Sequence, residues 1–365
     1  MSITLPSTTV RARVRALAPR RADWSRVRPA NDLTAGLLVG LVALPLALGF
    51  GVSSGMGAGA GLVTAIVAGV LAAVFGGSRV QVSGPTGAMT VVLVPIIATH
   101  GADGVLVVGL MAGLVLVGLA YAGAGRFIRY VPVPVVEGFT LGIAVIIALQ
   151  QVPAALGVDV HADQVLGLAT EAFRAWAGSP NWAPVAVTAG VVAVVLLLAR
   201  GRPTLPGSLV AVVAVTVGNA TSDLRLATIG HIPAGLPLPS LPSVPFADLG
   251  ALVLPAIAVA ALAALESLLS ATVADAMSVG GRHDSDRELL GQGIANLAVP
   301  LFGGIPATAA IARTAVNVRS GASSRLAAVV HALVLLGVVL VPPAGWGRSR
   351  SSRSPGCWSP RPCRW

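Results

Sequence analysis

The chain contains no lysine, and charged residues make up only 10% of its 365 positions. Soluble domains carry roughly 25% charged residues, so this scarcity excludes a soluble enzyme. Aromatic residues are also rare, at 4%. By contrast, 55% of the residues are hydrophobic and the mean hydropathy is +0.86. This composition predicts an all-α polytopic membrane protein whose environment is the lipid bilayer.

Cysteine is nearly absent too, since Cys357 and Cys363 are the only two. They do not support a disulfide framework or a metal site. The net charge of +10 would suggest a nucleic-acid partner in a soluble chain. Here seven arginines lie in the first thirty residues, and no stripe of arginine interleaved with aromatics follows. We therefore expect neither a metal nor nucleic acid as a partner.

Eleven apolar segments are candidates for membrane spans, because about twenty apolar residues cross a bilayer as a helix. The segment at 306–318 is short, and the one at 84–99 starts with Gly84-Pro85. Both are predicted to be interrupted helices with short β-like lead-ins. The eleven segments are 33–50, 59–76, 84–99, 104–122, 132–151, 184–200, 206–220, 249–276, 287–302, 306–318 and 325–343.

Arginine positions predict the orientation. With a cytoplasmic N-terminus, nine loop arginines lie inside and only Arg174 and Arg225 lie outside. Residues 1–31 are then a cytoplasmic arginine-rich tail and residues 32–343 the transmembrane domain. Residues 344–365 change abruptly to arginine, proline, tryptophan and cysteine. This change predicts a frameshifted or truncated reading frame, with a natural extracellular basic tail as the alternative.

Two tripeptides repeat, Phe75-Gly76-Gly77 and Phe302-Gly303-Gly304, and each precedes a proline, Pro85 or Pro306. The predicted topology enters one break from the inside and the other from the outside, which is typical of an inverted repeat. A helix that starts at each proline would present unpaired N–H groups, and such helix ends attract anions. We expect those donors at Thr86, Gly87 and Ala88 and at Thr308, Ala309 and Ala310. Two proline kinks in packed helices are the alternative.

Ionisable residues inside the spans are costly and therefore informative. Glu266 lies mid-span, and Ser270, four residues later, shares its helix face and would share its ligand. Arg313 either adds positive field at the anion site or pairs with Glu266. Glu137 lies near a span end, where snorkelling or capping is expected. The cluster 282–288 is interpreted as a solvated turn, with Asp284 or Asp286 capping the next helix.

Several motifs together resemble the SulP inorganic-anion permeases, relatives of the sulfate transporter and prestin family. The resemblance covers about residues 30–343. Its motifs are Leu44–Phe50, Phe75–Ala88, Pro134–Phe139, Ile229–Pro237, Glu266–Ser270 and Pro306–Arg313.

The resemblance implies a fold of two inverted seven-segment repeats, of which about 11 of 14 segments are present. Core segments would occupy 32–122 and 249–343, half of the gate would occupy 132–220, and the cytoplasmic STAS domain would be absent. The family's anion site maps onto the two predicted helix ends, with Phe50 as its aromatic and Arg313 as its basic neighbour. Glu266 and Ser270 match the family's cation site, which leaves sodium or proton coupling open.

The expected function is secondary active transport of sulfate or bicarbonate across a bacterial plasma membrane by an elevator-like movement of core against gate. A homodimer is a further expectation, and no cofactor is expected. The alternative is a non-transporting truncated remnant of such a permease. A membrane-embedded enzyme is not expected, because no nucleophile–base pair or metal cluster is present.

Overall fold

The computed structural model describes most of the chain. Some of the predictions concern residues outside this described part. Among those predictions are most of the tail 1–31, the motif at 229–234 and the tail 344–365. The described residues are 17–20, 24, 27–130, 133–160, 162, 164–201, 207–221, 235–243, 249–278 and 282–340.

The described chain is almost entirely helical, as expected. Five of its helices, α2, α3, α4, α8 and α10, are long and apolar enough to cross a membrane. Two two-residue strands are present, β1 (Ser83–Gly84) and β2 (Thr308–Ala309). The helices are α2 (Pro29–Ser53), α3 (Ala58–Phe75), α4 (Gly87–Ala122), α5 (Val133–Gln150), α6 (Val152–Leu156), α7 (Val165–Gly178), α8 (Trp182–Gly201), α9 (Gly207–Thr221), α10 (Leu249–Met277), α11 (Ser285–Ala298), α12 (Ile311–Arg319) and α13 (Arg325–Leu340), with 3-10 turns η2 (Ala124–Tyr130) and η4 (Val299–Phe302).

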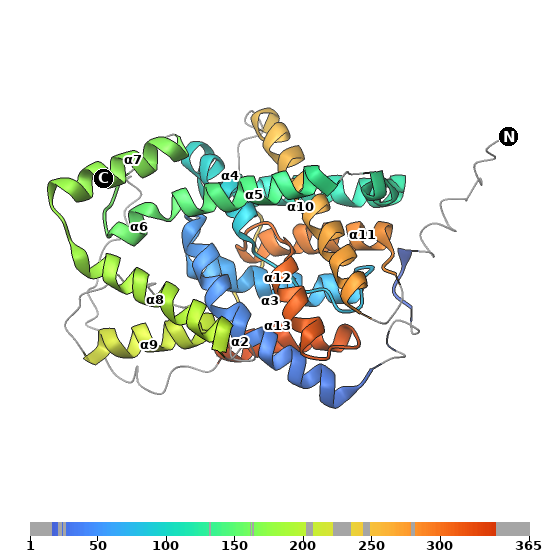
Figure 1. Cartoon of the computed structure of the whole chain (residues 1–365). Helices are drawn as coiled ribbons and strands as arrows, with labels where there is room; N and C mark the ends of the chain where they lie inside the picture. The colour runs from blue at the N-terminus through green and yellow to red at the C-terminus, as the bar shows by residue number, and fades with distance from the viewer. Residues whose placement is uncertain are drawn as a thin grey trace, which may run out of the picture.

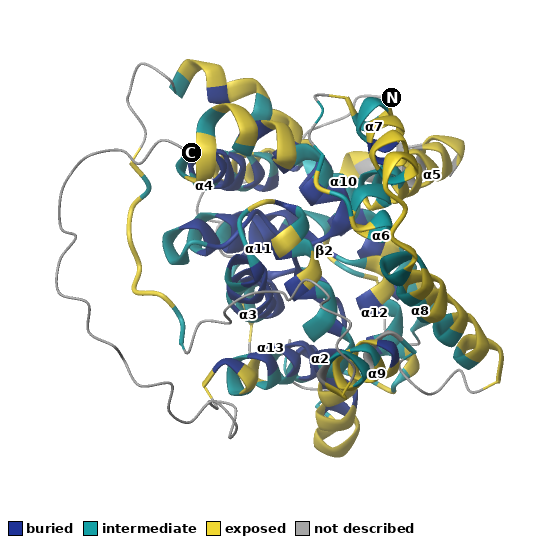
Figure 2. Cartoon of the chain, turned by 90° about the vertical axis from the view of Figure 1, so that its left-hand side faces the viewer, coloured by how far each residue is buried: buried dark blue, intermediate teal, exposed yellow. Residues whose placement is uncertain are grey.

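The first and last helices of the chain pack together into one bundle, here called the core bundle: α2–α4 and α10–α13 (Figure 1). Helix α13 packs against α2 and α3, and α11 packs against α3 and α4. Helices α6–α9 lie to one side of this bundle. Buried residues concentrate in the core bundle, whereas α8 has none (Figure 2).

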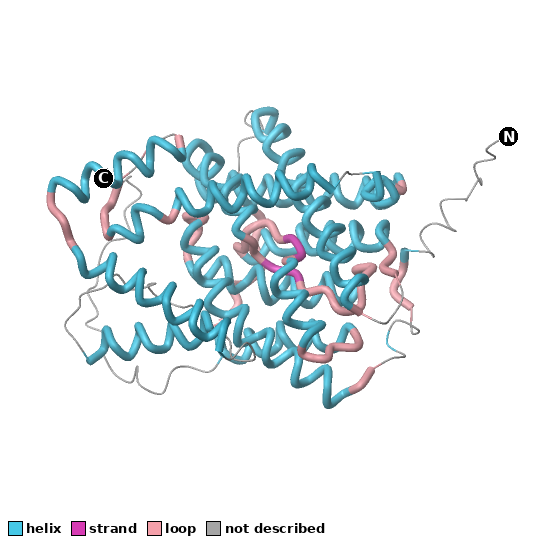
Figure 3. Tube along the Cα trace, in the orientation of Figure 1, coloured by secondary structure: helices cyan, strands magenta, loops and turns pink. Residues whose placement is uncertain are grey.

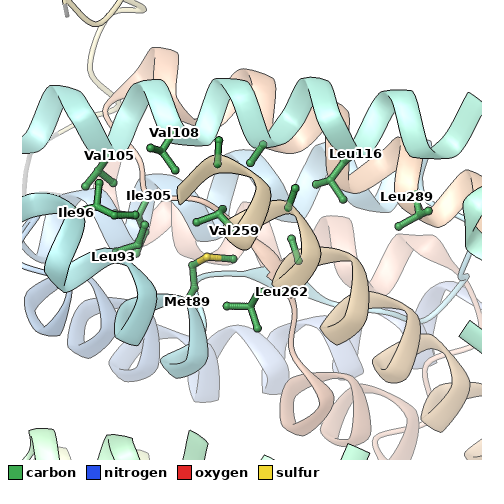
Figure 4. Close-up of a cluster of buried hydrophobic side chains, with 14 of the residues drawn as sticks. Met89, Leu93, Ile96, Val105, Val108, Leu116, Val259, Leu262, Leu289 and Ile305 are labelled. Carbon is green, nitrogen blue, oxygen red and sulfur yellow. The ribbon is translucent and has the colours of Figure 1, made fainter. Parts of the chain in front are cut away.

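One apolar cluster joins α4, α10 and α11. Its members from α4 include Met89, Leu93 and Leu116, and they meet Val259 and Leu262 of α10 (Figure 4). These side chains fill the space between helices that come from the two halves of the sequence. Burial of this cluster therefore holds the two halves together.

The two spans predicted at 84–99 and 104–122 form one element in the structure, helix α4, which is interrupted near its middle. The helix is broken at Gly101, whose φ of 67° and ψ of −169° are not helical. Glycine adopts positive φ without a steric penalty, so the break occurs at this residue. The segment between the predicted spans 132–151 and 184–200 is not a simple connection, because it contains the helices α6 and α7. Trp176 of α7 packs edge-on against Trp182, with ring centroids 4.9 Å apart.

The first and last described helices are also joined by a carboxylate. Asp32, in the first turn of α2, is completely buried. It accepts hydrogen bonds from the backbone N–H groups of Ser323 (2.7 Å) and Ser324 (3.1 Å), and from the Ser324 hydroxyl (2.7 Å). The Ser324 hydroxyl in turn accepts from the Leu326 N–H at 3.2 Å, in the first turn of α13, so Asp32 holds the N-cap residue of a helix that is distant in sequence.

Small residues allow close helix contacts in the core bundle. A Cβ atom at Gly61 of α3 would overlap the carbonyl oxygen of Ala47 in α2. On the outward face of α2, by contrast, a Cβ atom at Gly49 would meet nothing within 4 Å. The backbones of α2 and α3 therefore approach as closely as they do because position 61 lacks a side chain.

We expect Gly61→Ala to lower the stability of the purified protein, because the added methyl group forces α2 and α3 apart. Overpacking of this kind costs about 1–3 kcal/mol. Gly49→Ala is the matched control and should be neutral or slightly stabilising, since alanine favours a helix. Thermal unfolding in detergent measures both variants. Equal melting temperatures for the two variants would contradict the close contact.

Candidate anion site

The two short strands cross at the centre of the core bundle (Figure 3). They pair antiparallel, Ser83 opposite Ala309 and Gly84 opposite Thr308. The Ala310 N–H extends the pairing by donating to the carbonyl of Val82 at 3.1 Å. Because the strands are antiparallel, the helices that follow them, α4 and α12, start at opposite ends of this crossing.

The same register would next place Pro85 opposite Ala307. Proline has no N–H group, so it cannot donate to Ala307. Asn296 of α11 takes over this role. Its amide nitrogen donates to the Ala307 carbonyl at 2.9 Å, and its amide oxygen accepts from the Ala307 N–H at 2.8 Å. The side chain of Asn296 thus replaces the missing strand partner.

Other side chains satisfy the rest of the irregular backbone around the crossing. Thr64 of α3 accepts from the Ile305 N–H at 2.8 Å, and its hydroxyl lies 3.0 Å from the Ile305 carbonyl. Asn317 donates to the Val80 carbonyl at 2.7 Å. A hydrocarbon environment offers no water for such groups, so each one needs a partner from the protein.

Helix α4 starts at Gly87, with Thr86 as its N-cap. The Thr86 hydroxyl accepts from the Met89 N–H at 3.4 Å and donates to Oε2 of Glu266 at 2.9 Å. The amides of Gly87 and Ala88 have no acceptor among the described residues. A methyl group at Gly87 would lie 3.2 Å from Cε1 of Phe50. The predicted donors and the predicted aromatic residue therefore lie together at this helix end.

The second helix end differs from the prediction, because α12 starts at Ile311 and not at Pro306. Pro306 precedes β2, while Pro85 follows β1, so the two prolines do not occupy equivalent positions. The predicted donors lie within the crossing: the Ala309 N–H donates to Ser267 at 3.2 Å, and the Ala310 N–H pairs with β1. The first-turn amides belong instead to Ile311 and Ala312, which are both exposed.

Thr308 does not point a donor at this helix end either. Its hydroxyl lies 2.9 Å from the Ser267 hydroxyl and is fully buried. A helix that started at Pro306 would have left its first N–H groups unpaired. In the structure, the N–H groups of Ala309 and Ala310 are paired instead with Ser267 and Val82. The prediction that the second helix starts at Pro306 is therefore wrong, because pairing with a distant strand outweighs the local preference of proline for a helix start. Ala310 is the N-cap of α12, and the assignment of Thr308, Ala309 and Ala310 to the anion site stays a prediction.

Arg313 links the two helix ends. Its guanidinium is buried, and Nη2 donates to the Pro85 carbonyl at 2.6 Å, immediately before α4. Nη1 has no hydrogen-bond partner among the described residues. Of the two predicted roles, pairing with Glu266 is not seen as a hydrogen bond, although the two charges interact. A buried arginine with one unused nitrogen group adds positive field between α4 and α12.

Ser270 and Glu266 have different hydrogen-bond partners within the protein, and a shared cation stays a prediction. The Ser270 hydroxyl donates to Oγ1 of Thr314 at 3.1 Å, and Thr314 in turn accepts from the Val82 N–H at 3.2 Å. Ser270 therefore supports β1, one turn away from the carboxylate. Glu137 of α5 is exposed, away from this cluster.

The polar cluster at 282–288 forms a turn with a helix cap, but the turn is only partly solvated, because Arg287 and Glu288 are buried. Asp284 accepts from the Arg287 N–H at 3.1 Å and caps α11, as predicted. Glu288 accepts from the N–H groups of Gly77 (2.9 Å) and Ser78 (3.1 Å). The described residues contain no group of three or more potential ligands that would hold a metal ion.

The side chains that hold the crossing were not among the residues predicted from the sequence. Each is a polar residue within a predominantly apolar span, which is a readable signal in a membrane protein. Gln292 and Asn296, four residues apart on α11, would have been found in this way. The residues concerned are Thr64, Ser267, Gln292, Asn296, Thr314 and Asn317.

Comparison with known proteins agrees with this architecture. Residues 30–344 match the Sulfate permease family. The chain belongs to this family. YvdB of Bacillus subtilis, whose name assigns it to sulfate transport, is 42% identical over 318 residues, which cover 85% of this chain and 60% of YvdB. The bicarbonate transporter BicA of Picosynechococcus is 35% identical over 326 residues, covering 85% of this chain and 57% of BicA.

Solved structures confirm the inverted-repeat transporter fold. The transmembrane domain of a cyanobacterial bicarbonate transporter BicA superposes with a TM-score of 0.80 at 32% identity, covering 86% of this chain and 84% of that domain. Murine Slc26a9, an anion transporter, has the same fold at 17% identity, with a TM-score of 0.80 over 93% of this chain and 62% of that protein. The chain spans about 60% of the length of its relatives YvdB and BicA. The names of these relatives describe transporters and not enzymes.

We expect Thr64→Val to destabilise the protein, because valine keeps the shape of threonine but leaves the Ile305 N–H unpaired. An unsatisfied buried group costs about 1–3 kcal/mol. The matched control is Thr216→Val on α9, where an exposed hydroxyl bonds only to its own helix at Val212. Melting temperatures in detergent compare the two variants. The role of Thr64 at the crossing is refuted if both variants melt like the wild type.

Proposed function

We propose that this chain binds a small inorganic anion, sulfate or bicarbonate, between the starts of α4 and α12 and carries it by secondary transport. One observation supports this proposal above the others. The crossing places two helix N-termini around one buried arginine, and the amides of Gly87, Ala88, Ile311 and Ala312 are unused among the described residues. The names of the relatives YvdB and BicA point to the same class of substrate.

In the proposed site, the N–H groups of Gly87 and Ala88 face the anion from α4. Those of Ile311 and Ala312 face it from α12, where they replace the donors expected at 308–310. Each helix end carries a partial positive charge from its dipole and unpaired amides. Arg313 adds its positive charge to the site, and its Nη2 group is held by the Pro85 carbonyl.

Apolar side chains close the α4 side of the proposed site. A methyl group at Gly87 would lie 2.7 Å from Cδ1 of Ile147 in α5 and 3.2 Å from Phe50. Backbone amides recognise the charge and size of an anion and not its chemical identity. The surrounding small and apolar residues therefore accept sulfate and bicarbonate alike, and specificity between them would come from the size of the space.

For transport, we propose that the core bundle moves against the lateral helices α5–α9 in an elevator-like manner. The proposed setting is a bacterial plasma membrane, with the N-terminus in the cytoplasm and a homodimer as the assembly. The division is supported by burial: the core bundle is densely packed, whereas α8 contributes no buried residue. Ile147 belongs to α5 and contacts the anion-site end of α4, so movement between the two parts would open and close the proposed site.

Glu266 is the proposed site for a coupling cation, either sodium or a proton. Its carboxylate is half-buried and accepts a hydrogen bond from Thr86, the cap of the anion-binding helix. Neutralising this carboxylate would remove a negative charge from the neighbourhood of the anion. A cation at Glu266 would therefore favour anion binding a few ångströms away.

Gly87→Asp should abolish anion binding, because the new carboxylate occupies the helix-end field. Two like charges about 4 Å apart near a protein surface repel by about 4 kcal/mol, so affinity should fall by at least ~100-fold. Gly87→Asn has the same size without the charge and should lose less. Calorimetric titration with sulfate and bicarbonate gives the affinities, and uptake of labelled anion into liposomes tests transport. If Gly87→Asp and Gly87→Asn bind the anion with equal affinity, the charge argument is wrong. If the wild-type protein binds the anion but liposomes do not take it up, the proposed site is retained and the proposed transport is refuted.

Glu266→Gln should remove the dependence of anion binding on sodium or pH, while the protein still binds the anion. Glutamine keeps the acceptor for Thr86 but cannot neutralise a cation. Glu137→Gln, on the exposed α5 position, is the control and should retain the dependence. The measurement is sulfate affinity with and without sodium at fixed ionic strength. Wild-type behaviour in Glu266→Gln would exclude this residue as the cation site.

A further inference from the structure

One end of the core bundle brings together the starts of α2, α11 and α13 and the ends of α3, α10 and α12 (right in Figure 1). Hydrogen bonds hold these ends side by side. Asp32 joins the start of α2 to the start of α13. Arg325 of α13 donates to the carbonyl of Ala73, near the end of α3, at 2.7 Å. The Asp284 N–H before α11 donates to the Gly77 carbonyl after α3 at 3.4 Å, and a 2.9 Å hydrogen bond joins α11 to η2, which follows α4.

Exposed arginines occupy this end of the bundle. They come from separate elements: Arg28 precedes α2, Arg126 lies in η2, Arg282 precedes α11 and Arg319 is the last residue of α12. Arg126 lies over the ring of Phe127, 5.1 Å from its centroid, and Phe127 is itself 55% exposed. Exposed aromatic and basic side chains occur together where a protein contacts lipid headgroups. The surface that carries these four arginines is called the basic end.

Leu17 attaches the N-terminal segment to the core bundle. Its side chain is buried in the apolar cluster that joins α4, α10 and α11, and residues 17–20 lie on the same side of the molecule as the basic end (Figure 1). Residues 1–28 contain seven arginines and one acidic residue, Asp23. None of the seven is more than six positions from Leu17 or Arg28. Because both of these residues are placed on the bundle, the length of the chain keeps all seven arginines near the basic end.

The acidic residues at the basic end are bound within the protein. Asp284 caps α11, and Asp286 accepts a hydrogen bond from a backbone N–H of η2. Asp275, near the end of α10, accepts a 2.7 Å hydrogen bond from a histidine ring. Asp32 and Glu288 are buried. These carboxylates offset part of the positive charge of the bundle, so the arginines of the N-terminal segment make this end strongly positive.

We propose that the basic end and the N-terminal segment together bind anionic phospholipid headgroups of the adjoining leaflet. Arginine suits this partner, because its planar guanidinium donates two parallel hydrogen bonds to a phosphate. Clusters of about four to eight basic residues directly beside a membrane span favour anionic lipids. The cluster here leads directly into α2, which is long and apolar enough to cross a membrane. Lipid binding at this end does not involve the proposed anion site, so it is independent of transport.

A lipid leaflet matches the position of these charges better than a soluble anion does. Arg28 lies immediately before α2, and Arg126 follows the end of α4 by four residues. Both guanidinium groups are therefore close to the boundary between the apolar helices and water. Phe127 adds an exposed apolar ring beside Arg126. A lipid interface buries such a ring, whereas a free phosphate ion gains nothing from it.

The test uses the full-length chain reconstituted in phosphatidylcholine bilayers. Electron spin resonance compares trace spin-labelled phosphatidylglycerol with spin-labelled phosphatidylcholine, and the immobilised fraction of each gives its relative affinity for the protein. Wild-type protein should prefer phosphatidylglycerol by about threefold or more at low salt, and high salt should reduce this preference through screening. A variant that combines five substitutions in the N-terminal segment should lose most of the preference. The substitutions are Arg11→Gln, Arg13→Gln, Arg15→Gln, Arg21→Gln and Arg26→Gln.

Arg174→Gln is the matched control, because Arg174 is exposed on α7, away from the basic end (Figure 1), and it should keep the preference. Arg126→Gln leaves the N-terminal segment unchanged and should lower the preference in part. Equal affinity of the wild type for the two lipids overturns the proposal, and so does an unchanged preference in the variant with five substitutions. If inorganic phosphate at fixed ionic strength abolishes the preference, the surface binds free phosphate and the assignment to lipid is wrong.

Discussion

The need to satisfy backbone groups where two extended segments cross inside an apolar bundle determines most of this structure. Strands β1 and β2 supply only a few hydrogen bonds to each other. Side chains from α3, α10, α11 and α12 supply the rest, and Asn296 stands in for a strand edge that Pro85 cannot provide. Because these donors must reach the crossing, the helices that carry them have to surround it. The helix starts of α4 and α12, and with them the candidate anion site, follow from this arrangement.

The membrane class, the helical architecture and the approximate spans could all be predicted from hydropathy and glycine or proline positions. The start of α4 was also predictable, since Pro85 and Thr86 are local signals for a helix start. The start of α12 was not, because Pro306 carries the same local signal while pairing with β1 delays the helix to Ile311. Strand pairing joins residues more than 220 positions apart, and no local pattern contains that information.

The candidate site shows the same division between local and distant information. Gly87, Ala88 and Phe50 came from motifs and lie together in the structure. Ser270 was predicted from helix periodicity, which shows which residues share one face of a helix but not which residues contact that face. In the structure its hydrogen-bond partner is Thr314. The unused Nη1 group of Arg313 is visible only when every neighbour is known.

The bonds by which Asp32 holds the start of α13 also bear on how the protein is made. Asp32 and its partner Ser323 are 291 positions apart. At synthesis rates of about 5–20 residues per second, Asp32 therefore waits roughly 15 to 60 seconds before this partner has been synthesised. During that interval a buried carboxylate of the finished protein is exposed to solvent or to the insertion machinery. Assembly of the core bundle is thus a late event, completed only when nearly all of its helices have been synthesised.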